Sequence, residues 1–181
     1  MKRRDFLQNT LALGAGLLPG VGLAKGLLGD VSQATTGIDY ANATIECIRR
    51  AAERGDPVAQ YSLGDHYFCG RGVIKSDTES VKWTRRAAEQ GHAGAQKWLG
   101  DCYFIGIGVQ QNDAEAMKWY HRAAEQGYDH AQCWLGRCYY YGKGISQDYI
   151  EAKKWLRKAA EQGNASARKL LQQFYEKGAP S

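Results

Sequence analysis

Apolar, aromatic and glycine positions recur along most of this chain with a period of 36 residues. The interval separates Trp83, Trp119 and Trp155, and it also separates the glycines Gly55, Gly91, Gly127 and Gly163. A fixed period between about 30 and 40 residues, with two helical patterns in each unit, indicates an α-solenoid in which each unit buries its apolar face on the next. The pattern therefore predicts an all-α solenoid of helix pairs, here termed helix A and helix B.

The boundaries of the helices follow from local signals in each unit. In one unit we expect helix A over about residues 93–105 and helix B over about residues 113–126. The pentapeptide AAEQG occupies 87–91, 123–127 and 159–163, with the variant AAERG at 51–55. Its final glycine is typical of a left-handed helix end, where only glycine avoids a Cβ penalty. Asp56, Asp129 and Asn164 are predicted to cap helices A.

The first and last parts of the repeat region differ from the complete units. Residues 40–55 read as a helix B without its helix A, so the first unit is a half unit. At the other end, Leu170, Leu171 and Phe174 cover one face of a last helix whose other face is polar, as expected of a capping helix. Glycine follows leucine at 64, 100 and 136, which predicts close contact between helices, and glutamine replaces it in the last copy at Gln172.

The string AQKWLGDCYFIGIGVQQNDAEAMKWYHRAAEQG, residues 95–127, resembles the bacterial Sel-one-like repeat, a longer relative of the tetratricopeptide repeat. The resemblance covers residues 39–178, comprising a half unit, three full units and the capping helix, and leaves 179–181 as a tail. It implies a right-handed superhelix of antiparallel helix pairs that acts as an adaptor for proteins or peptides. Secreted cysteine-rich members of the family have also been linked to β-lactam binding or hydrolysis.

The first residues predict export from a bacterial cytoplasm. A basic segment is followed by about fifteen apolar residues interrupted by glycine, too short for a comfortable membrane span. Arg3, Arg4, Phe6 and Leu7 resemble the twin-arginine signal. We expect a signal peptide over 1–24, with a second candidate cut at residue 34, and a linker over 25–38. An ordinary secretory signal or an uncleaved anchor is the alternative.

Composition and charge narrow the class of partner. An apolar content of 44% is enough to bury a core. Loss of the first 24 residues, with Lys2, Arg3 and Arg4 against Asp5, lowers the net charge from +5 to +3. This charge is too weak to argue for nucleic acid as the partner.

His66, Cys102 and Cys138 share one register position, but neighbouring helix axes stand about 8–10 Å apart, so we expect no metal site and no cofactor. Cys69 and Cys102 are candidates for a disulfide between neighbouring helices A.

Positions that change from unit to unit are available for recognition, whereas constant positions serve packing. The changing positions on helix A lie four residues apart and so share one face, which would line the concave wall of the solenoid. Phe68, Phe104 and Tyr140 lie beside them. We name this set the variable face and expect it to bind the partner: Tyr61, Asp65, Phe68, Lys97, Asp101, Phe104, Arg137, Tyr140 and Tyr141. Ordinary solvated surface is the alternative.

Helix B carries a basic stripe with an acidic partner in each unit. Glu79, Glu115 and Glu151 stand three residues before Lys82, Lys118 and Lys154, a spacing that predicts ion pairs on a solvated outer face.

One catalytic pattern is present, Ser166 with Lys169, which matches the Ser-x-x-Lys of penicillin-binding enzymes. Its two companion motifs are absent, and a pattern with two fixed positions arises readily by chance.

The sequence thus predicts an exported, non-enzymatic repeat protein of the periplasm or the cell exterior. Its expected partner is a protein or peptide of the cell envelope, and no membrane span is expected to remain after processing. The alternative function is a β-lactam-binding or hydrolysing envelope protein.

Overall fold

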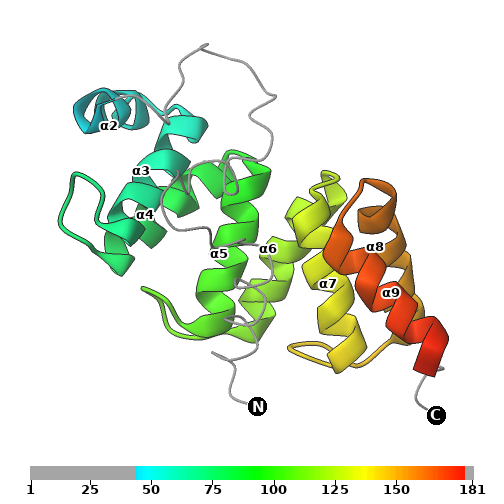
Figure 1. The fold of residues 1–181 in the computed structure, drawn as a ribbon. Coiled ribbons are helices and arrows are strands. Elements are labelled where there is room, and N and C mark those ends of the chain that lie inside the picture. The colour runs from blue at the N-terminus through cyan, green and yellow to red at the C-terminus, as the bar shows by residue number, and fades with distance from the viewer. Residues whose placement is uncertain (1–43, 178–181) are drawn as a thin grey trace, which may run out of the picture.

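The computed structural model describes residues 44–177, and this part of the chain is built from helices joined by short turns (Figure 1). The helices are α2 (Ile45–Glu53), α3 (Pro57–Cys69), α4 (Asp77–Glu89), α5 (Ala93–Ile105), α6 (Asp113–Glu125), α7 (Asp129–Tyr141), α8 (Tyr149–Glu161) and α9 (Ala165–Lys177). Helices A are α3, α5, α7 and α9, and helices B are α2, α4, α6 and α8. The predicted export signal, linker and tail lie outside the described residues.

Helices that are consecutive in the sequence pack against one another, most closely in the pairs α3–α4, α5–α6 and α7–α8. Glycine on the first helix of each pair permits this approach. A Cβ atom at Gly100 would lie 2.6 Å from the ring of Tyr120, and one at Gly136 would lie 2.7 Å from Leu156 Cγ. Both distances are shorter than packed carbon atoms tolerate. The predicted role of these glycines in helix contact is confirmed.

The pentapeptide AAEQG ends each helix B in the same way. Gly91 has φ +93°, and Gly55, Gly127 and Gly163 have φ between +87° and +98°. The Gly91 N–H donates to the carbonyl of Ala88 at 3.0 Å, and the His92 N–H donates to that of Ala87 at 3.1 Å. These two bonds form a Schellman motif, which satisfies carbonyl groups that the helix end leaves open. The predicted left-handed ends are confirmed.

The capping predictions at the other helix ends hold in two cases of three. Asp56 Oδ1 accepts from the Val58 N–H at 2.8 Å, and Asn164 Oδ1 accepts from the Ala167 N–H at 3.0 Å. The prediction for Asp129 is wrong, because Tyr128 occupies the N-cap and Asp129 is already helical. The Asp129 carboxylate instead accepts a hydrogen bond from Asn164 Nδ2 at 2.8 Å, which joins α7 to the start of α9.

A column of buried glutamines links each unit to the one before it. Gln96 on α5 donates to the carbonyl of Ala88 at the end of α4 (3.1 Å) and accepts from Gln126 Nε2 at the end of α6 (2.6 Å). Gln60 and Gln132 make the same pair of bonds in their own units. The fourth residue of AAEQG is therefore one half of a clamp, and the sequence-based prediction missed it. In α9, Arg168 replaces the glutamine and donates to Ala160 O at 3.2 Å.

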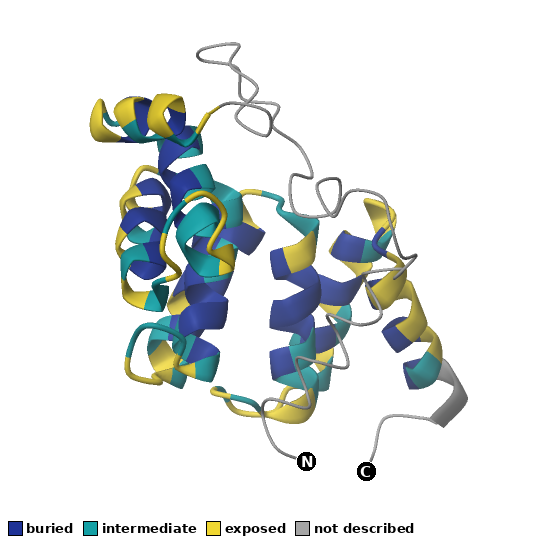
Figure 2. Ribbon diagram, turned by 60° about the vertical axis from the view of Figure 1, so that its left-hand side comes forward, coloured by how far each residue is buried: buried dark blue, intermediate teal, exposed yellow. Residues whose placement is uncertain are grey.

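The core runs along the helix sides that face neighbouring helices (dark blue in Figure 2), and exposed residues lie on the outer sides and in turns. Each hydrophobic cluster draws residues from two units. Leu99 and Cys102 of α5, for example, pack with Val81 of α4 and Trp119 of α6. Trp119, Trp134 and Trp155 are buried. Trp98 is half-buried, and its ring lies 4.8 Å from that of Phe68.

The outer faces of helices B carry the predicted ion pairs. Lys82 lies 3.1 Å from Glu79, Lys118 lies 2.5 Å from Glu115, and Lys154 lies 2.9 Å from Glu151. All three lysine side chains are more than half exposed, so each pair contributes little to stability. Along residues 44–177, no helix combines the length and the apolar character needed to cross a bilayer.

Candidate binding face of the helices A

The nine residues of the variable face come from three successive helices A. Tyr61, Asp65 and Phe68 lie on α3; Lys97, Asp101 and Phe104 lie on α5; Arg137, Tyr140 and Tyr141 lie on α7. The structure buries two of them, Asp101 (3% exposed) and Phe104 (1% exposed). The others are partly exposed, and Tyr141 is the most open of them at 44%.

Asp101 forms a buried polar centre between α5 and α6. One carboxylate oxygen accepts from Lys97 Nζ at 2.6 Å, and the other accepts from the Tyr120 hydroxyl at 2.8 Å. Tyr120 is fully buried, so Asp101 satisfies a hydroxyl that would otherwise lack an acceptor. A partner cannot reach Asp101 in this conformation, and the expectation that Asp101 is a contact residue is therefore corrected: it organises packing.

Phe104 also belongs to the core. It joins the cluster around Met117, Tyr120 and Leu135, and its ring lies 6.4 Å from that of Trp134. The expectation that Phe104 borders an open groove is corrected for the same reason as Asp101. Asp101 and Phe104 have the same identities as Asp65 and Phe68 in the preceding unit, and neither of the two faces solvent.

Aromatic and charged side chains remain accessible at both ends of the variable face. On α3, the Tyr61 ring lies 4.8 Å from His92, and Asp65 pairs with Arg71. On α7, the Tyr140 ring contacts Tyr141 at 4.7 Å and Phe174 at 4.5 Å. These contacts hold the rings in place without covering them fully, as binding residues of low conformational freedom require.

The middle of the face holds two cations beside one indole ring. Lys97 Nζ lies 5.9 Å from the centre of the Trp134 ring, and the Arg137 guanidinium lies 5.1 Å from it. The Tyr120 ring stacks on the same indole at 6.3 Å. Trp134 therefore fixes the positions of Lys97 and Arg137, in addition to its packing in the core.

The buried tyrosines and cysteines of this region have raised pKa values, which suits packing in the interior rather than acid–base chemistry. Burial raises the pKa of Tyr120 well above that of a free tyrosine, and it raises the pKa of Tyr128 to about 12. Burial likewise raises the pKa of Cys133 to about 11 and that of Cys138 to about 12. These phenols and thiols stay protonated near neutral pH, which disfavours nucleophilic or general-base roles.

The other sites considered from the sequence gain no support from the geometry. Cys69 is exposed and Cys102 is buried, and both are free thiols. Within residues 44–177, no three histidine, cysteine or acidic side chains cluster as metal ligands would. Ser166 and Lys169 are both exposed on α9, so nothing there supplies the enclosed site that acyl transfer to a serine needs.

The repeat units match a known family model. Residues 57–92, 93–128 and 129–164 each match the Sel1 repeat. This chain belongs to the Sel1 repeat family. The predicted fold, an all-α right-handed solenoid of antiparallel helix pairs with a 36-residue period, is confirmed. Sel1 repeat solenoids generally act as scaffolds for protein interaction.

Solved Sel1 repeat structures are similar to this chain in sequence and fold. A protective antigen of uropathogenic Escherichia coli with an SLR fold is 41% identical, with a TM-score of 0.73 over 75% of this chain and 29% of that one. A Sel1 repeat protein from Oxalobacter formigenes is also 41% identical, with a TM-score of 0.67 over 71% of this chain and 97% of that one. This chain thus spans less than a third of the antigen.

A more distant structure shares the fold alone. Helicobacter pylori cysteine rich protein B is 21% identical, with a TM-score of 0.55 over 71% of this chain and 98% of that one. No curated protein sequence matches this chain.

Proposed function

We propose that this Sel1 repeat protein is an exported adaptor that binds a protein or peptide of the cell envelope along the variable face of its helices A. The contrast between constant and variable positions carries the proposal. The repeated leucines, alanines and glutamines are buried. Residues at positions that differ in at least one of the three units stay at least partly accessible: Tyr61, Asp65, Phe68, Lys97, Arg137, Tyr140 and Tyr141. Aromatic side chains and arginine are the types enriched at binding hot spots.

The surroundings of these side chains support recognition by pre-organised groups. Trp134 orders two cations, and ring contacts order Tyr140 and Tyr141. Binding therefore costs less side-chain entropy than it would on free surface residues.

The test of this face uses substitutions that the repeat itself tolerates. Tyr141→Ile places the residue found at the same position in the preceding unit, Ile105, and Arg137→Gln removes the charge beside Trp134. We expect the double variant to fold and to lose a partner captured by crosslinking in the cell envelope. Lys118→Gln on the outer face of α6 is the control and should retain it. Full retention by the double variant would remove the variable face as the binding site.

The proposed route to the periplasm or the cell exterior rests on the N-terminal sequence. Arg3, Arg4, Phe6 and Leu7 follow the twin-arginine pattern. The double variant Arg3→Lys, Arg4→Lys should leave the precursor inside the cell, which fractionation and immunoblotting would detect. Unchanged export of this variant would exclude the twin-arginine route. The description of a similar structure as a protective antigen is consistent with a protein exposed outside the cytoplasm.

A further inference from the structure

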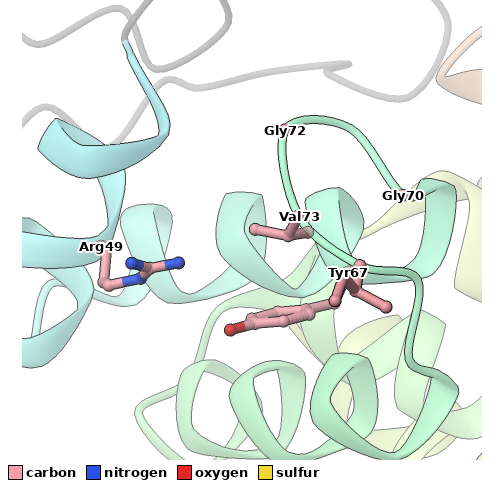
Figure 3. A pocket seen from close by; sticks show the side chains of 6 residues that line it. Arg49, Tyr67, Gly70, Gly72 and Val73 are labelled. Carbon is pink, nitrogen blue, oxygen red and sulfur yellow. The ribbon is translucent and has the colours of Figure 1, made fainter.

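An open hollow of about 720 Å³ lies between α2 and the turn that joins α3 to α4 (Figure 3). Its lining comprises Arg49 of α2, Tyr67 of α3, and Gly70, Gly72, Val73 and Ile74 of the turn. Small-molecule sites in proteins commonly occupy about 300–1,000 Å³. The hollow lies outside the variable face and shares no residue with it.

The hollow exists because α2 begins one helical turn late in the repeat register. The helices α4, α6 and α8 begin at Asp77, Asp113 and Tyr149, 36 residues apart, whereas α2 begins at Ile45 with Thr44 as an extended N-cap. In the later units, the turn after helix A packs on that first helical turn. A Cβ atom at Gly108 would lie 2.2 Å from Asp77 O, and one at Gly144 would lie 2.9 Å from Asp113 Cβ.

Among the described residues, the turn of the first complete unit has less support. The nearest neighbour of a Cβ atom at Gly72 would be the Ile45 side chain, at an ordinary contact distance of 3.6 Å. No helical turn within residues 44–177 fills the space beside residues 70–74 that such a turn fills in the other units. Ile74 is 91% exposed there, while the same position holds the polar residues Gln110 and Ser146 in later units.

A basic residue and a tyrosine that bond directly in the later units face this opening without meeting. Arg85 donates to the Tyr103 hydroxyl at 2.9 Å, and the ring of His121 lies 3.3 Å from the Tyr139 hydroxyl. The equivalent residues are Arg49 and Tyr67, which approach the hollow from opposite sides (Figure 3). Among the described residues no hydrogen bond joins them. Within residues 44–177, Arg49 makes one ion pair, with Glu46 at 3.7 Å, and the side chains of Arg49 and Glu46 are each at least 40% exposed.

We propose that the hollow binds the free carboxyl end of a peptide chain whose last residue is apolar. The carboxylate accepts hydrogen bonds from the Arg49 guanidinium and the Tyr67 hydroxyl, and so bridges the pair that is closed in the other units. The last side chain packs on Val73 and Ile74. A chain end fits better than an acidic side chain, because its carboxylate and its apolar group are attached to the same Cα atom. Peptide ends are recognised in this manner elsewhere.

The test uses the full chain and two tripeptide probes. Acetyl-Gly-Val-Leu with a free carboxylate should shift the NMR signals of the Arg49 Nε–H and of the Gly70, Gly72 and Val73 amides, in a saturable way. The same tripeptide as its amide should bind at least about tenfold more weakly, because the charge-assisted hydrogen bonds are lost. Acetyl-Gly-Asp-Gly amide, which has only a side-chain carboxylate, should not produce these shifts.

Matched variants separate the site from a general effect of charge. Arg49→Gln and Tyr67→Phe should each weaken binding of the free acid, the arginine variant by about tenfold or more. Ile74→Gln, which installs the residue of the next unit, should weaken it too. Arg85→Gln removes the equivalent arginine from a closed pair and should leave the affinity unchanged.

Four results would overturn the proposal. They are equal binding of the acid and the amide, equal losses for the Arg49 and Arg85 variants, strong binding of the side-chain carboxylate, and no saturable shift with the full chain. The last result includes the case in which another part of the chain fills the hollow. None of these results bears on the variable face, because its partner is tested by separate substitutions.

Discussion

One register position shows how far the surroundings of a residue depend on its unit. Asp65, Asp101 and Arg137 are equivalent by the 36-residue period, yet Asp65 pairs with Arg71 near the surface and Asp101 is buried. The difference comes from the facing helix B. Thr84, Tyr120 and Leu156 are equivalent to one another, and only the tyrosine carries a hydroxyl long enough to reach the carboxylate of its own unit.

Removal of the Asp101 carboxylate should destabilise the solenoid strongly. Asp101→Ala leaves the Tyr120 hydroxyl buried without its acceptor and leaves Lys97 without its counter-ion. We expect a loss of about 2–4 kcal/mol in the free energy of unfolding. Asp65→Ala, at the equivalent position, should cost less than about 1 kcal/mol because its ion pair is partly solvated. Urea unfolding of both variants measures the difference, and equal losses would contradict the burial argument.

The cap of α5 makes stability depend on pH. His92 Nδ1 accepts from the Ala95 N–H at 3.0 Å, and burial lowers the pKa of His92 below its usual value near about 6.5. The folded state therefore favours the neutral ring. Its contribution to stability is complete above the unfolded pKa and is lost as the pH falls from there toward the lower folded pKa.

Substitution by a residue that caps without titrating isolates this effect. His92→Asn keeps a side-chain acceptor, like Asn164 at the start of α9, but cannot take up a proton. Between about pH 7.5 and about pH 5.5, the wild-type chain should lose more unfolding free energy than the variant. Urea midpoints at the two pH values provide the comparison. The same pH dependence in both chains would show that other groups cause it.

At the scale of the helices, the pentapeptide AAEQG combines three separate physical roles. Its alanines permit close packing and supply carbonyl groups, its glutamine clamps the preceding helix A, and its glycine closes a Schellman motif. The three roles recur together because they sit within one helical turn of each other. The repeat is therefore the frame of the molecule rather than its recognition surface.

Helix positions could be read from the sequence because glycine ends and apolar periodicity are local signals. The predicted helix over 93–105 agrees with α5, and the prediction over 113–126 exceeds α6 by one residue. The glutamine clamp depends on two side chains 30 residues apart, and the burial of Asp101 depends on the identity of Tyr120. Such long-range pairs leave only a weak trace, the recurrence of Ala-Gln at 59–60, 95–96 and 131–132.

The central clamp provides a test at this scale. Gln96→Ala removes the bonds to Ala88 O and from Gln126 Nε2, and leaves the Gly91 N–H as the remaining donor to the Ala88 carbonyl. We expect a cost of about 2 kcal/mol, the sum of two net hydrogen bonds. Gln110→Ala, on an exposed turn of the same unit, should change stability by less than about 0.5 kcal/mol. Similar effects of the two substitutions would show that the clamp contributes nothing.

The described part of the molecule, residues 44–177, is a linear array in which most packing is between neighbours. Within it, helices α3 to α8 each pack on a helix before and a helix after, whereas α2 packs on α3 and α9 packs on α8. The end helices bury their apolar sides and expose their polar sides. In α2, for example, Ile48, Ala51 and Ala52 are buried, and the other residues are partly or fully exposed. Stability in such an array is close to a sum of unit and interface terms.

Protection against hydrogen exchange should therefore fall from the middle of the array to its ends. Because α2 and α9 each rest on one interface among the described helices, their amides can open by breaking that interface alone, whereas α5 and α6 must break two. Native-state exchange followed by NMR should show amides of α2 and α9 exchanging at least about tenfold faster than those of α5 and α6, since one interface is worth more than about 1.4 kcal/mol. Gln96→Ala should then speed exchange in α5 more than in α9, because the clamp joins α5 to α4 and α6. Uniform protection from α2 to α9, in the wild-type chain and in the variant alike, would instead mean that the solenoid opens only as a single cooperative unit.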